Sequence, residues 1–420
     1  MTPSARLQAV IDILDALKAT AQPADRLLKD WFRTRRFAGS KDRAAITERV
    51  FAVLRHARPL AHRMGSDEGR ALVIASLLEE GLDVPALDTL FSGAGYGAGV
   101  LSEEERARIA AAPGDAPLHI AGDFPQFLES ELSAAFGASL LDEMRALQMR
   151  APVDLRVNRL KATREAVTAA LALENISVLP TPYSAIGLRL APGTGSSALS
   201  RGAAFLGGLF EFQDEAAQIC ALLCGVKPGL RVLDMAAGAG GKSLALSALM
   251  QNTGEIVACD VRPAPLQELI ARADRAGDKI IRTQITTDAP PDGPFDIVLV
   301  DAPCSGSGTW RRQPELKLRF TAQRLAELIR LQDELLEQAA SRVAADGRLV
   351  YATCSILPSE NEARIQAFMA RHPEFSVMSA SDAWQGPPVP GLASFFKATP
   401  HTTGTDGFFT ALLSRARVKG

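Results

Sequence analysis

The chain has few cysteines and no long apolar run. Only five cysteines occur in 420 residues, and no two of them form a C-x-x-C pair. An odd number in this arrangement argues against a disulfide framework and favours a reducing compartment. No stretch reaches the ~18 uncharged apolar residues of a membrane span, and the N-terminus, which carries Arg6 and Asp12, lacks a secretory signal. We therefore expect a cytoplasmic protein without membrane contact.

Metal-binding spacing is also lacking. Cys220 and Cys224 are four residues apart on a predicted helix, but no His or Cys follows them at the spacing of a zinc site. A buried position in a hydrophobic core is the usual place for such cysteines. The sequence therefore predicts core packing for this pair and no metal site.

The chain as a whole has no excess of one charge, with a formal net charge of −2. Net charge alone therefore does not steer it towards nucleic acid. The first 65 residues differ, because they contain 13 Lys and Arg but only 6 Asp and Glu. The basic side chains there cluster with aromatic ones, namely Arg33, Arg35, Arg36, Lys41 and Arg43 with Trp31, Phe32 and Phe37. This mixture suits a nucleic-acid face; the alternative is a solvated helix face whose rings turn inward.

A run of very small residues follows a short apolar strand in the middle of the chain. Leu230, Val232 and Leu233 predict a buried strand that ends in Asp234, and residues 243–250 predict a helix. The loop between them, Ala236-Ala237-Gly238-Ala239-Gly240-Gly241-Lys242, allows a tight turn and a close approach by a ligand. The next predicted strand, 256–260, ends in Asp260, where doubly wound folds hold a ribose hydroxyl. These features predict a nucleotide-type pocket at a helix N-terminus.

Three kinds of ligand could use this loop. A P-loop needs G-x-x-x-x-G-K-[ST], and residues 241–243 fit its end, but Ala236 occupies the place of its first glycine. Asp301, after an apolar strand, could hold the magnesium ion of such a nucleoside triphosphatase. A dinucleotide fold needs G-x-G-x-x-G, in which Ser243 would replace the last glycine. The third candidate is S-adenosylmethionine, and the loop alone does not choose among them.

Two cysteines follow two predicted strands of the same sheet. Residues 296–300 run into Asp301-Ala302-Pro303-Cys304-Ser305-Gly306, and residues 347–352 run into Thr353-Cys354-Ser355. In open parallel sheets, ligands bind at the carboxyl ends of the strands. Cysteines in polar loops at this edge do not fit the usual role of a lone buried cysteine. Cys304 and Cys354 are therefore candidate catalytic residues.

Together these motifs resemble the Sun (Fmu) family of RNA cytosine-C5 methyltransferases. The resemblance is carried by residues 301–306 and 352–355, and it extends through 212–217, 308–312 and 405–409. It covers the chain strongly from about residue 150 onward. One departure is the loop 238–242, which lacks the proline of the family's usual Ala-Pro-Gly-Gly-Lys; Gly and Ala can still make this turn. The resemblance implies S-adenosylmethionine as the cofactor and RNA as the partner.

The resemblance also implies roles for individual residues. Cys354 would be the nucleophile that adds to C6 of cytosine, and Cys304 would assist product release. The reverse assignment is the alternative, because DNA cytosine methyltransferases use a Pro-Cys loop, which is Pro303-Cys304 here. Asp301 would lie between cofactor and base. The cofactor would be held by the loop Ala236–Lys242, by Asp260 at the ribose, and by Asp288 at the adenine edge.

The order of predicted elements indicates three domains. Residues 1–145 read as helical and are similar to the NusB-like RNA-binding domain of bacterial family members. Residues 146–210 mix short strands and helices, which in the family form a ferredoxin-like RNA-binding subdomain. Residues 211–420 alternate strands and helices, which predicts a parallel sheet covered on both faces. The fold class is thus α/β, a Rossmann-like methyltransferase domain preceded by an all-α domain and a small α+β subdomain.

Finer predictions concern single segments. Residues 375–378 and 407–413 are expected to add an antiparallel pair to the sheet, and residues 379–404 to form a loop over the substrate. Asp123 is expected to cap a helix. Five basic residues of the second domain could contact phosphates, with ordinary surface charge as the alternative: Arg150, Arg156, Arg159, Lys161 and Arg164.

The sequence therefore predicts a monomeric, S-adenosylmethionine-dependent RNA cytosine-C5 methyltransferase. Ribosomal RNA is the expected substrate, because the NusB-like domain accompanies the branch of the family that modifies it. Transfer RNA is the alternative within this class. A P-loop nucleoside triphosphatase and a non-catalytic RNA-binding protein are the alternatives from other classes.

Overall fold

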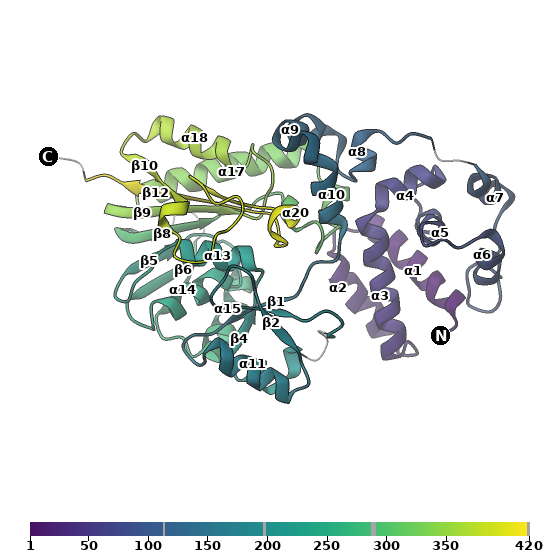
Figure 1. The fold of residues 1–420 in the computed structure, drawn as a ribbon, viewed down its shortest axis with the longest axis horizontal. Coiled ribbons are helices and arrows are strands. Elements are labelled where there is room, and N and C mark those ends of the chain that lie inside the picture. The colour runs from purple at the N-terminus through teal and green to yellow at the C-terminus, as the bar shows by residue number, and fades with distance from the viewer. Residues whose placement is uncertain (112–113, 196–198, 287–290, 418–420) are drawn as a thin grey trace. The chain divides into compact units, whose positions relative to one another are not determined.

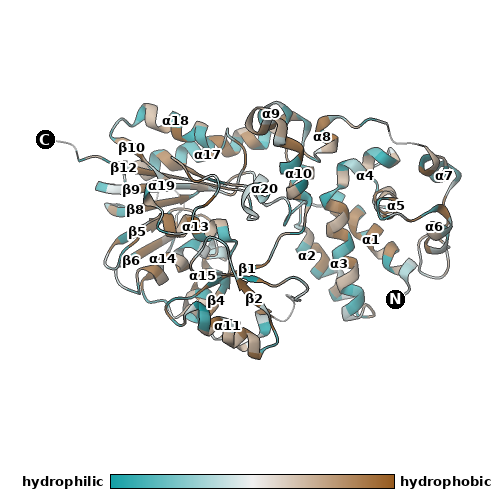
Figure 2. Cartoon of the chain, viewed as in Figure 1, coloured by the Kyte–Doolittle hydropathy of each residue, from teal (hydrophilic) through white to brown (hydrophobic). Residues whose placement is uncertain are grey.

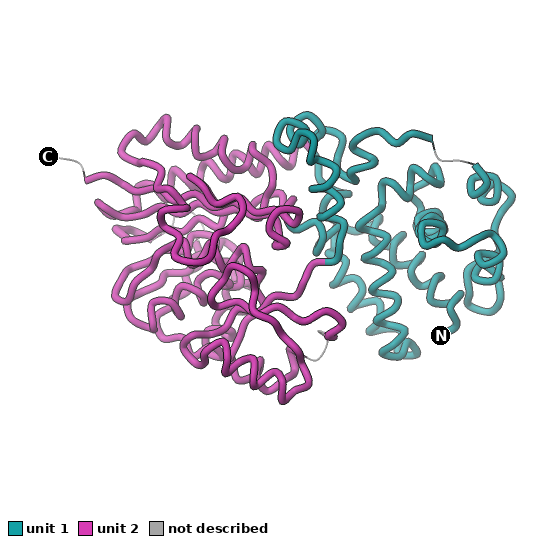
Figure 3. The backbone as a smooth tube through the Cα atoms, in the orientation of Figure 1, with its two compact units in different colours: residues 1–150, 309–321 teal, residues 151–308, 322–420 magenta. Residues whose placement is uncertain are grey.

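The computed structural model describes residues 1–111, 114–195, 199–286 and 291–417. Figure 1 shows the course of the chain. It forms two compact units, residues 1–150 with 309–321 (unit 1) and residues 151–308 with 322–420 (unit 2), which Figure 3 distinguishes by colour. In the described part of the chain, no helix combines the length and the apolar character needed to cross a membrane.

Unit 1 is helical, which confirms the predicted character of the N-terminal region. The central helix α5 (Gly69–Glu79) is buried almost all round and packs against α1 (Pro3–Lys18) and α4 (Ala57–Met64). A helix that is apolar on every side requires this position. In contrast, α3 (Ser40–Arg55) carries hydrophobic and hydrophilic residues side by side (Figure 2). The remaining helices are α2 (Ala24–Thr34), α6 (Val84–Leu90), α7 (Glu103–Ala110), α8 (Leu118–Ala121), α9 (Glu129–Phe136) and α10 (Leu140–Gln148).

Residues 309–321 follow the Cys304 loop in the chain but belong to unit 1. In α16 (Glu315–Arg319), Lys317 is 2% exposed, and its Nζ donates hydrogen bonds to Asp123 and, at 2.8 Å, to the carbonyl oxygen of Arg55. Asp123 has a positive φ of 54° and also accepts a bond from the backbone N of Arg58 at 3.1 Å. Asp123 thus does not cap the helix that follows it in the chain, which was the prediction. Its carboxylate instead binds the first turn of α4 and is the buried partner of Lys317, which is far away in sequence.

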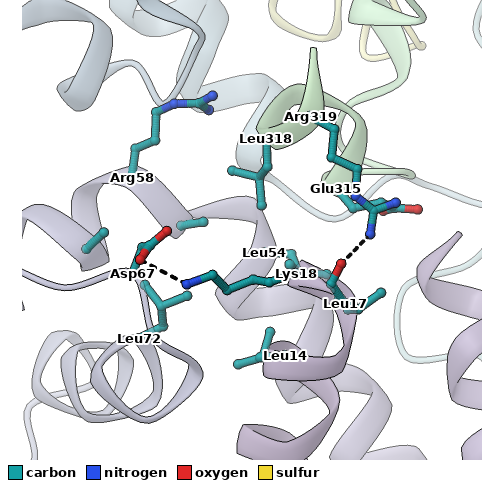
Figure 4. A pocket seen from close by; sticks show the side chains of 12 residues that line it. Leu14, Leu17, Lys18, Leu54, Arg58, Asp67, Leu72, Glu315, Leu318 and Arg319 are labelled. Atoms are coloured by element: carbon teal, nitrogen blue, oxygen red, sulfur yellow. Dashed lines mark hydrogen bonds and ion pairs between the residues drawn. The ribbon is translucent and has the colours of Figure 1, made fainter. Parts of the chain in front are cut away.

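Two further contacts fix α16 in this unit. Glu315 accepts a hydrogen bond from the backbone N of Ala24 at 3.0 Å and so caps the start of α2. Arg319 donates one to the carbonyl oxygen of Leu17 at 2.7 Å (Figure 4), near the C-terminal end of α1. Together, these bonds satisfy backbone groups that helix ends leave unpaired.

The smaller sheet of unit 2 has the strand order β2-β3-β1-β4 and is antiparallel. Its strands are β1 (Asp154–Val157), β2 (Val178–Pro180), β3 (Gly187–Leu190) and β4 (Phe210–Phe212). Helices α11 (Arg164–Leu173) and α12 (Ala203–Leu206) contribute to its core through Val167, Leu171 and Ala204. Thr163 is the N-cap of α11, and its Oγ1 accepts a hydrogen bond from the backbone N of Ala166.

The larger sheet has the order β10-β12-β9-β8-β5-β6-β7, with β11 paired to β12. The five strands β9, β8, β5, β6 and β7 run parallel to one another. Strand β12 is antiparallel to its two neighbours β9 and β10, so β10 and β12 form the predicted antiparallel pair. This Rossmann-like arrangement confirms the predicted fold class. The strands are β5 (Arg231–Asp234), β6 (Glu255–Asp260), β7 (Ile281–Ile285), β8 (Phe295–Asp301), β9 (Val343–Thr353), β10 (Phe375–Met378), β11 (Phe396–Ala398) and β12 (Phe408–Arg415).

Alternate residues of one strand pack on opposite faces of this sheet. Along β8, Val298 and Val300 contribute to the core that contains α17 (Ala322–Ala340) and α18 (Glu362–Arg371). Ile297 and Leu299 contribute to the core that contains α13 (Glu215–Leu223) and α14 (Gly241–Leu249). Helix α15 (Pro263–Ala276), between β6 and β7, packs on α14. Cys220 and Cys224 are fully buried in this core, as predicted.

The segment 379–404 is more ordered than the loop that the sequence predicts. It contains α19 (Ala380–Ala383), β11 and α20 (Pro400–Thr403). Strand β11 pairs with β12 at Phe408–Thr410. Successive side chains of a strand point to opposite faces, so Phe396 and Ala398 are buried and Lys397 is exposed. Three residues are too few for an alternating pattern to be recognised.

Candidate active site

Asp234 begins the site at the carboxyl end of β5. Its carboxylate is 1% exposed, and Oδ2 accepts a hydrogen bond from the hydroxyl of Ser243 at 2.6 Å. Oδ1 has no hydrogen-bond partner among the described residues. Burial raises the pKa of Asp234 to about 7. The edge of the sheet thus contains a buried acid with one free acceptor.

The small-residue loop between β5 and α14 turns as the sequence predicts. Gly238 and Gly240 have φ of 54° and 77°, which side chains rarely adopt. A Cβ on Gly240 would lie 2.0 Å from Cδ1 of Leu269, whereas a Cβ on Gly238 would meet no described atom within 4 Å. Gly240 is therefore required by packing, and the loop leaves open space beside Gly238.

Two arginines anchor the carbonyl groups of this loop, a role that the sequence did not indicate. Arg156, 3% exposed, donates to the carbonyl oxygen of Gly241 at 2.5 Å, and Arg272 donates to that of Ala239 at 2.7 Å. Burial lowers the pKa of Arg156 to about 10. Arg156 is therefore not available for the predicted phosphate contact. Lys161 is also engaged, because its Nζ donates to the carbonyl oxygens of Gly207 and Arg275.

Asp260 lies at the end of β6, as predicted, and its Oδ2 accepts a hydrogen bond from the backbone N of Gly238 at 3.0 Å. Arg262 also donates to both of its carboxylate oxygens. Burial alone would raise the pKa of Asp260, but these hydrogen bonds outweigh it, and the pKa lies below its ordinary value. Asp288, the residue predicted at the adenine edge, lies outside the described residues.

Lys242 and Asp301 form an ion pair at the carboxyl edge of the sheet. The Nζ of Lys242 lies 2.6 Å from Oδ2 of Asp301 and 5.0 Å from the centroid of the Phe408 ring. Burial alone would lower the pKa of Lys242, but the charge of Asp301 outweighs it, and the pKa lies above its ordinary value. Lys242 therefore stays charged and holds Asp301 in place.

The two candidate cysteines lie side by side. The Sγ atoms of Cys304 and Cys354 are 3.4 Å apart, and both residues are half-buried. The backbone N of Gly308 donates to the carbonyl oxygen of Cys354 at 3.0 Å. The hydrogen bond to Cys354, burial and the charge of Glu360 all raise the pKa of Cys304. Cys304 therefore retains its proton and can donate it towards the Cys354 sulfur.

In unit 1, the predicted aromatic and basic cluster is only partly exposed. Phe32 is 8% exposed in the core, whereas Phe37 is 69% exposed. The guanidinium of Arg35 lies 4.3 Å from the centroid of the Trp31 ring. These residues, apart from Phe32, line a cavity of about 750 Å³ together with Tyr96, which is 94% exposed. The inward-facing alternative thus holds for Phe32, and the other rings remain near the surface.

The residues around the loop fit S-adenosylmethionine. The open space beside Gly238 can accept a ligand, Asp260 can accept hydrogen bonds from a ribose diol, and Asp234 offers an unused acceptor. A sulfonium cation suits an edge that carries several acids. In the described part of the chain, no three His, Cys, Asp or Glu side chains are grouped to hold a metal ion.

Comparisons with protein families place the chain among methyltransferases. A model described as 16S rRNA methyltransferase RsmB/F matches residues 221–414, and a ferredoxin-like domain model of RsmF/B-like methyltransferases matches residues 124–195. The first match includes both cysteines and the loop at Gly238. It disfavours the P-loop interpretation, in which Ala236 already occupied the place of a required glycine.

Curated relatives agree with this family. The chain is 34% identical over 302 residues to a probable ribosomal RNA small subunit methyltransferase B of Synechocystis, covering 70% of this chain and 67% of that protein. It is 34% identical over 291 residues to ribosomal RNA small subunit methyltransferase B of Sodalis glossinidius, covering 68% and 64%. The chain thus matches about two thirds of the length of these relatives.

Solved structures share the fold. The crystal structure of PH0851 superposes with a TM-score of 0.79 at 26% identity, covering 99% of both chains. A methyltransferase homolog from Pyrococcus horikoshii gives a TM-score of 0.61 at 25% identity and covers 71% of this chain and 97% of its own. NSun6 from Pyrococcus horikoshii, solved with SFG, gives 0.62 at 23% identity.

Proposed function

Because the chain belongs to the RsmB/F family of S-adenosylmethionine-dependent 16S rRNA methyltransferases, we propose that it methylates C5 of a cytosine in ribosomal RNA. The observation that carries this proposal is the pair of cysteine sulfurs 3.4 Å apart at the carboxyl edge of the sheet. Methylation at a ring nitrogen or a hydroxyl needs no cysteine nucleophile, whereas C5 of cytosine must first be activated.

Activation at C5 explains why a thiolate is needed. The thiolate of Cys354 adds to C6, and the electron pair of the C5–C6 bond makes C5 a nucleophile. S-adenosylmethionine supplies the electrophilic methyl group. Loss of the proton from C5 then re-forms the double bond, breaks the C6–S bond and returns Cys354 as a thiolate.

The neighbouring side chains support these steps. Before the attack, the thiol of Cys304 donates a hydrogen bond to the sulfur of Cys354, 3.4 Å away. After methylation, a base must accept the C5 proton, and Cys304 assists the release step in which the C6–S bond breaks. Asp301, fixed by Lys242, contacts the N3 and N4 edge of the base, so that charge can spread over the ring. The target base must be flipped out of its stack to reach this pocket.

The cofactor is proposed to bind along the small-residue loop. Residues 236–242 would wrap the methionine and the ribose, Asp260 would hold the ribose hydroxyls, and Asp288 would contact adenine. In this arrangement Arg262 must release Asp260 when the ribose binds, and its 67% exposed side chain can do so readily.

RNA is proposed to contact both units. In unit 2, Arg159 and Arg164 line a cavity of about 560 Å³ at the start of α11, where phosphates are favoured. In unit 1, the exposed rings of Phe37 and Tyr96 can stack on unpaired bases beside Arg35. We also propose the three-domain division, the relation of unit 1 to NusB-like domains and a monomeric state.

The direct test is nucleoside analysis of the product. Unmodified 16S rRNA and, in parallel, unmodified tRNA are incubated with the protein and S-adenosylmethionine, digested and examined by mass spectrometry. We expect 5-methylcytidine from 16S rRNA with the wild type and none with Cys354→Ala. 5-Methylcytidine from tRNA alone would reassign the substrate, and a methyl group at another position would contradict the proposed chemistry.

A further inference from the structure

A fully buried carboxylate lies beside both cysteine loops. Glu360 is 0% exposed and stands just before α18. Its Oε1 accepts hydrogen bonds from the backbone N of Ser305 at 2.8 Å and from Nε2 of Gln332 at 3.0 Å. Its Oε2 accepts bonds from the hydroxyls of Ser305 and Ser355, both at 2.5 Å. Three of the four donors thus belong to the residues that directly follow the two cysteines.

Within the described ranges, no Lys or Arg forms an ion pair with Glu360. A buried carboxylate without a cation costs free energy unless hydrogen bonds satisfy its oxygens. Here four donors replace the counter-ion. Burying such a polar cluster costs desolvation free energy, which an apolar core at the same place would not incur.

A third hydroxyl group, that of Ser307, extends the cluster. Ser305 and Ser355 both donate to Glu360, and their hydroxyl oxygens lie 3.2 Å apart. The hydroxyl oxygen of Ser307 lies 3.1 Å from that of Ser305 and 3.0 Å from that of Ser355, and it accepts a bond from the backbone N of Ile356 at 3.0 Å. The three hydroxyl groups and the Glu360 carboxyl group therefore form one buried hydrogen-bonded cluster between the two cysteine loops.

Asn361, which follows Glu360 in the chain, also binds the loop of Cys354. The hydroxyl of Thr353 donates to Oδ1 of Asn361 at 2.5 Å, and Nδ2 of Asn361 donates to the carbonyl oxygen of Ser355 at 2.9 Å. The residues on either side of Cys354 are therefore bound to one side chain. Glu360 adds the connection from this loop to the loop of Cys304.

We propose that Glu360 is a positioning residue that joins the Cys304 and Cys354 loops through Ser305 and Ser355 and so sets the separation of the two sulfur atoms. The inference rests on the proposed function in that it assumes both cysteines act on one base. It adds a charge effect as well. Because the negative charge of Glu360 favours the protonated form of Cys304, it keeps a thiol donor beside Cys354.

Two substitutions separate shape from charge. Glu360→Gln keeps the length of the side chain but turns an NH2 group towards hydroxyl donors that need an acceptor. Glu360→Asp keeps the charge on a shorter side chain. Glu362→Gln is the matched control. Glu362 lies two residues further on, in α18, and forms an ion pair at 2.5 Å with Lys397 of β11.

The first readout is steady-state kinetics with unmodified 16S rRNA. We expect Glu360→Gln to lower kcat about 100-fold, with KM for RNA within about threefold of wild type, since misplacing reactive groups by about 1 Å has this effect. Glu360→Asp should recover part of the loss, and Glu362→Gln should match wild type. Thermal unfolding and S-adenosylhomocysteine binding show whether each variant is folded.

The second readout is the chemistry of the thiols without RNA. The oxidant diamide takes two electrons and two protons from Cys304 and Cys354 and leaves a disulfide, which peptide mapping quantifies. We expect Glu360→Gln to form this disulfide about tenfold more slowly than wild type, because the sulfurs are less well aligned. The pH midpoint for alkylation of Cys304 should move down, since the neighbouring negative charge is gone.

The outcomes are distinct. An unchanged kcat and an unchanged rate of disulfide formation in a folded Glu360→Gln variant would overturn the proposal. Equal losses of kcat, cofactor binding and thermal stability would also overturn it, because they would show a general structural role. If Glu360→Gln does not fold, Ser355→Ala removes one bond to the carboxylate and should show the same pattern at smaller size. If Cys354→Ala methylates RNA as well as wild type, the proposed function fails, whatever Glu360 does.

Discussion

Asp234 shows how strongly a single residue at the end of β5 depends on its surroundings. Its pKa of about 7 means that the folded chain keeps a proton which the unfolded chain has already released above about pH 4. The unfolded state therefore binds fewer protons in this window. The contribution of Asp234 to the free energy of unfolding is therefore fully present below pH 4. It is lost as the pH rises through 7, and the loss is at most about 4 kcal/mol.

Asp234→Asn tests this reasoning, because an amide cannot ionise. We expect the variant and the wild type to unfold at similar temperatures near pH 4, and the variant to be the more stable protein at pH 8. Calorimetry between pH 4 and pH 8 measures the difference. Parallel curves for the two proteins would show that Asp234 does not titrate in this range.

Gly240 is a second residue whose identity is fixed by geometry. Gly240→Ala combines an unfavourable φ with an overlap against Leu269, and we expect it to cost about 2–4 kcal/mol and to weaken S-adenosylhomocysteine binding. Gly229→Ala is the control, since Gly229 has a φ of 92° but no described atom within 4 Å of an added Cβ. Gly229→Ala should lower the free energy of unfolding only by the smaller amount that the unfavourable φ costs. Equal losses for both variants, measured by denaturant unfolding, would contradict the steric argument.

At the scale of elements, α16 depends on one buried lysine. Lys317→Ala leaves Asp123 without its partner, and breaking a buried pair in this way costs about 3–5 kcal/mol. We expect faster hydrogen exchange in α4 and in residues 309–321, while the large sheet keeps its protection. Lys397→Ala removes a half-exposed lysine from the surface and should change little. Unchanged exchange in Lys317→Ala would refute this account of the segment.

The elements were predictable to different degrees. Strands β5, β6, β8 and β9 were expected because buried parallel strands are continuous apolar runs. The three-residue strand β11 was missed because it is formed through pairing with β12. The assignment of residues 309–321 to unit 1 was missed for a similar reason, since Lys317 and Asp123 are far apart in sequence and each resembles an ordinary surface charge.

At the scale of the whole molecule, the Cys304 loop of unit 2 leads directly into residues 309–321, which belong to unit 1. A chain reduced to residues 151–420 would keep α16 but lose Asp123, Arg55 and the ends of α1 and α2. We expect residues 309–321 of such a chain to be cleaved quickly by a protease and methyl transfer to fall. If the shortened chain resists cleavage there and keeps the wild-type kcat, unit 1 is not needed to order this segment.

The candidate site shows what motifs can and cannot reveal. Strand order alone predicted that Cys304 and Cys354 would meet at one edge, because the carboxyl ends of neighbouring parallel strands lie together. The supporting side chains were not predictable. Glu360, Arg156 and Arg272 act through hydrogen bonds to loops between other elements, and such bonds leave no periodic pattern in a sequence.

In the proposed reaction, Cys354 bonds to the base and Cys304 assists its release. The most direct measurement is a denaturing gel of the protein mixed with S-adenosylmethionine and unmodified 16S rRNA, comparing wild type, Cys304→Ala and Cys354→Ala. We predict a protein–RNA band that accumulates with Cys304→Ala, because the adduct forms but is not released, and no band with Cys354→Ala. A band with Cys354→Ala alone would reverse the two roles, and no band with any variant would contradict covalent catalysis.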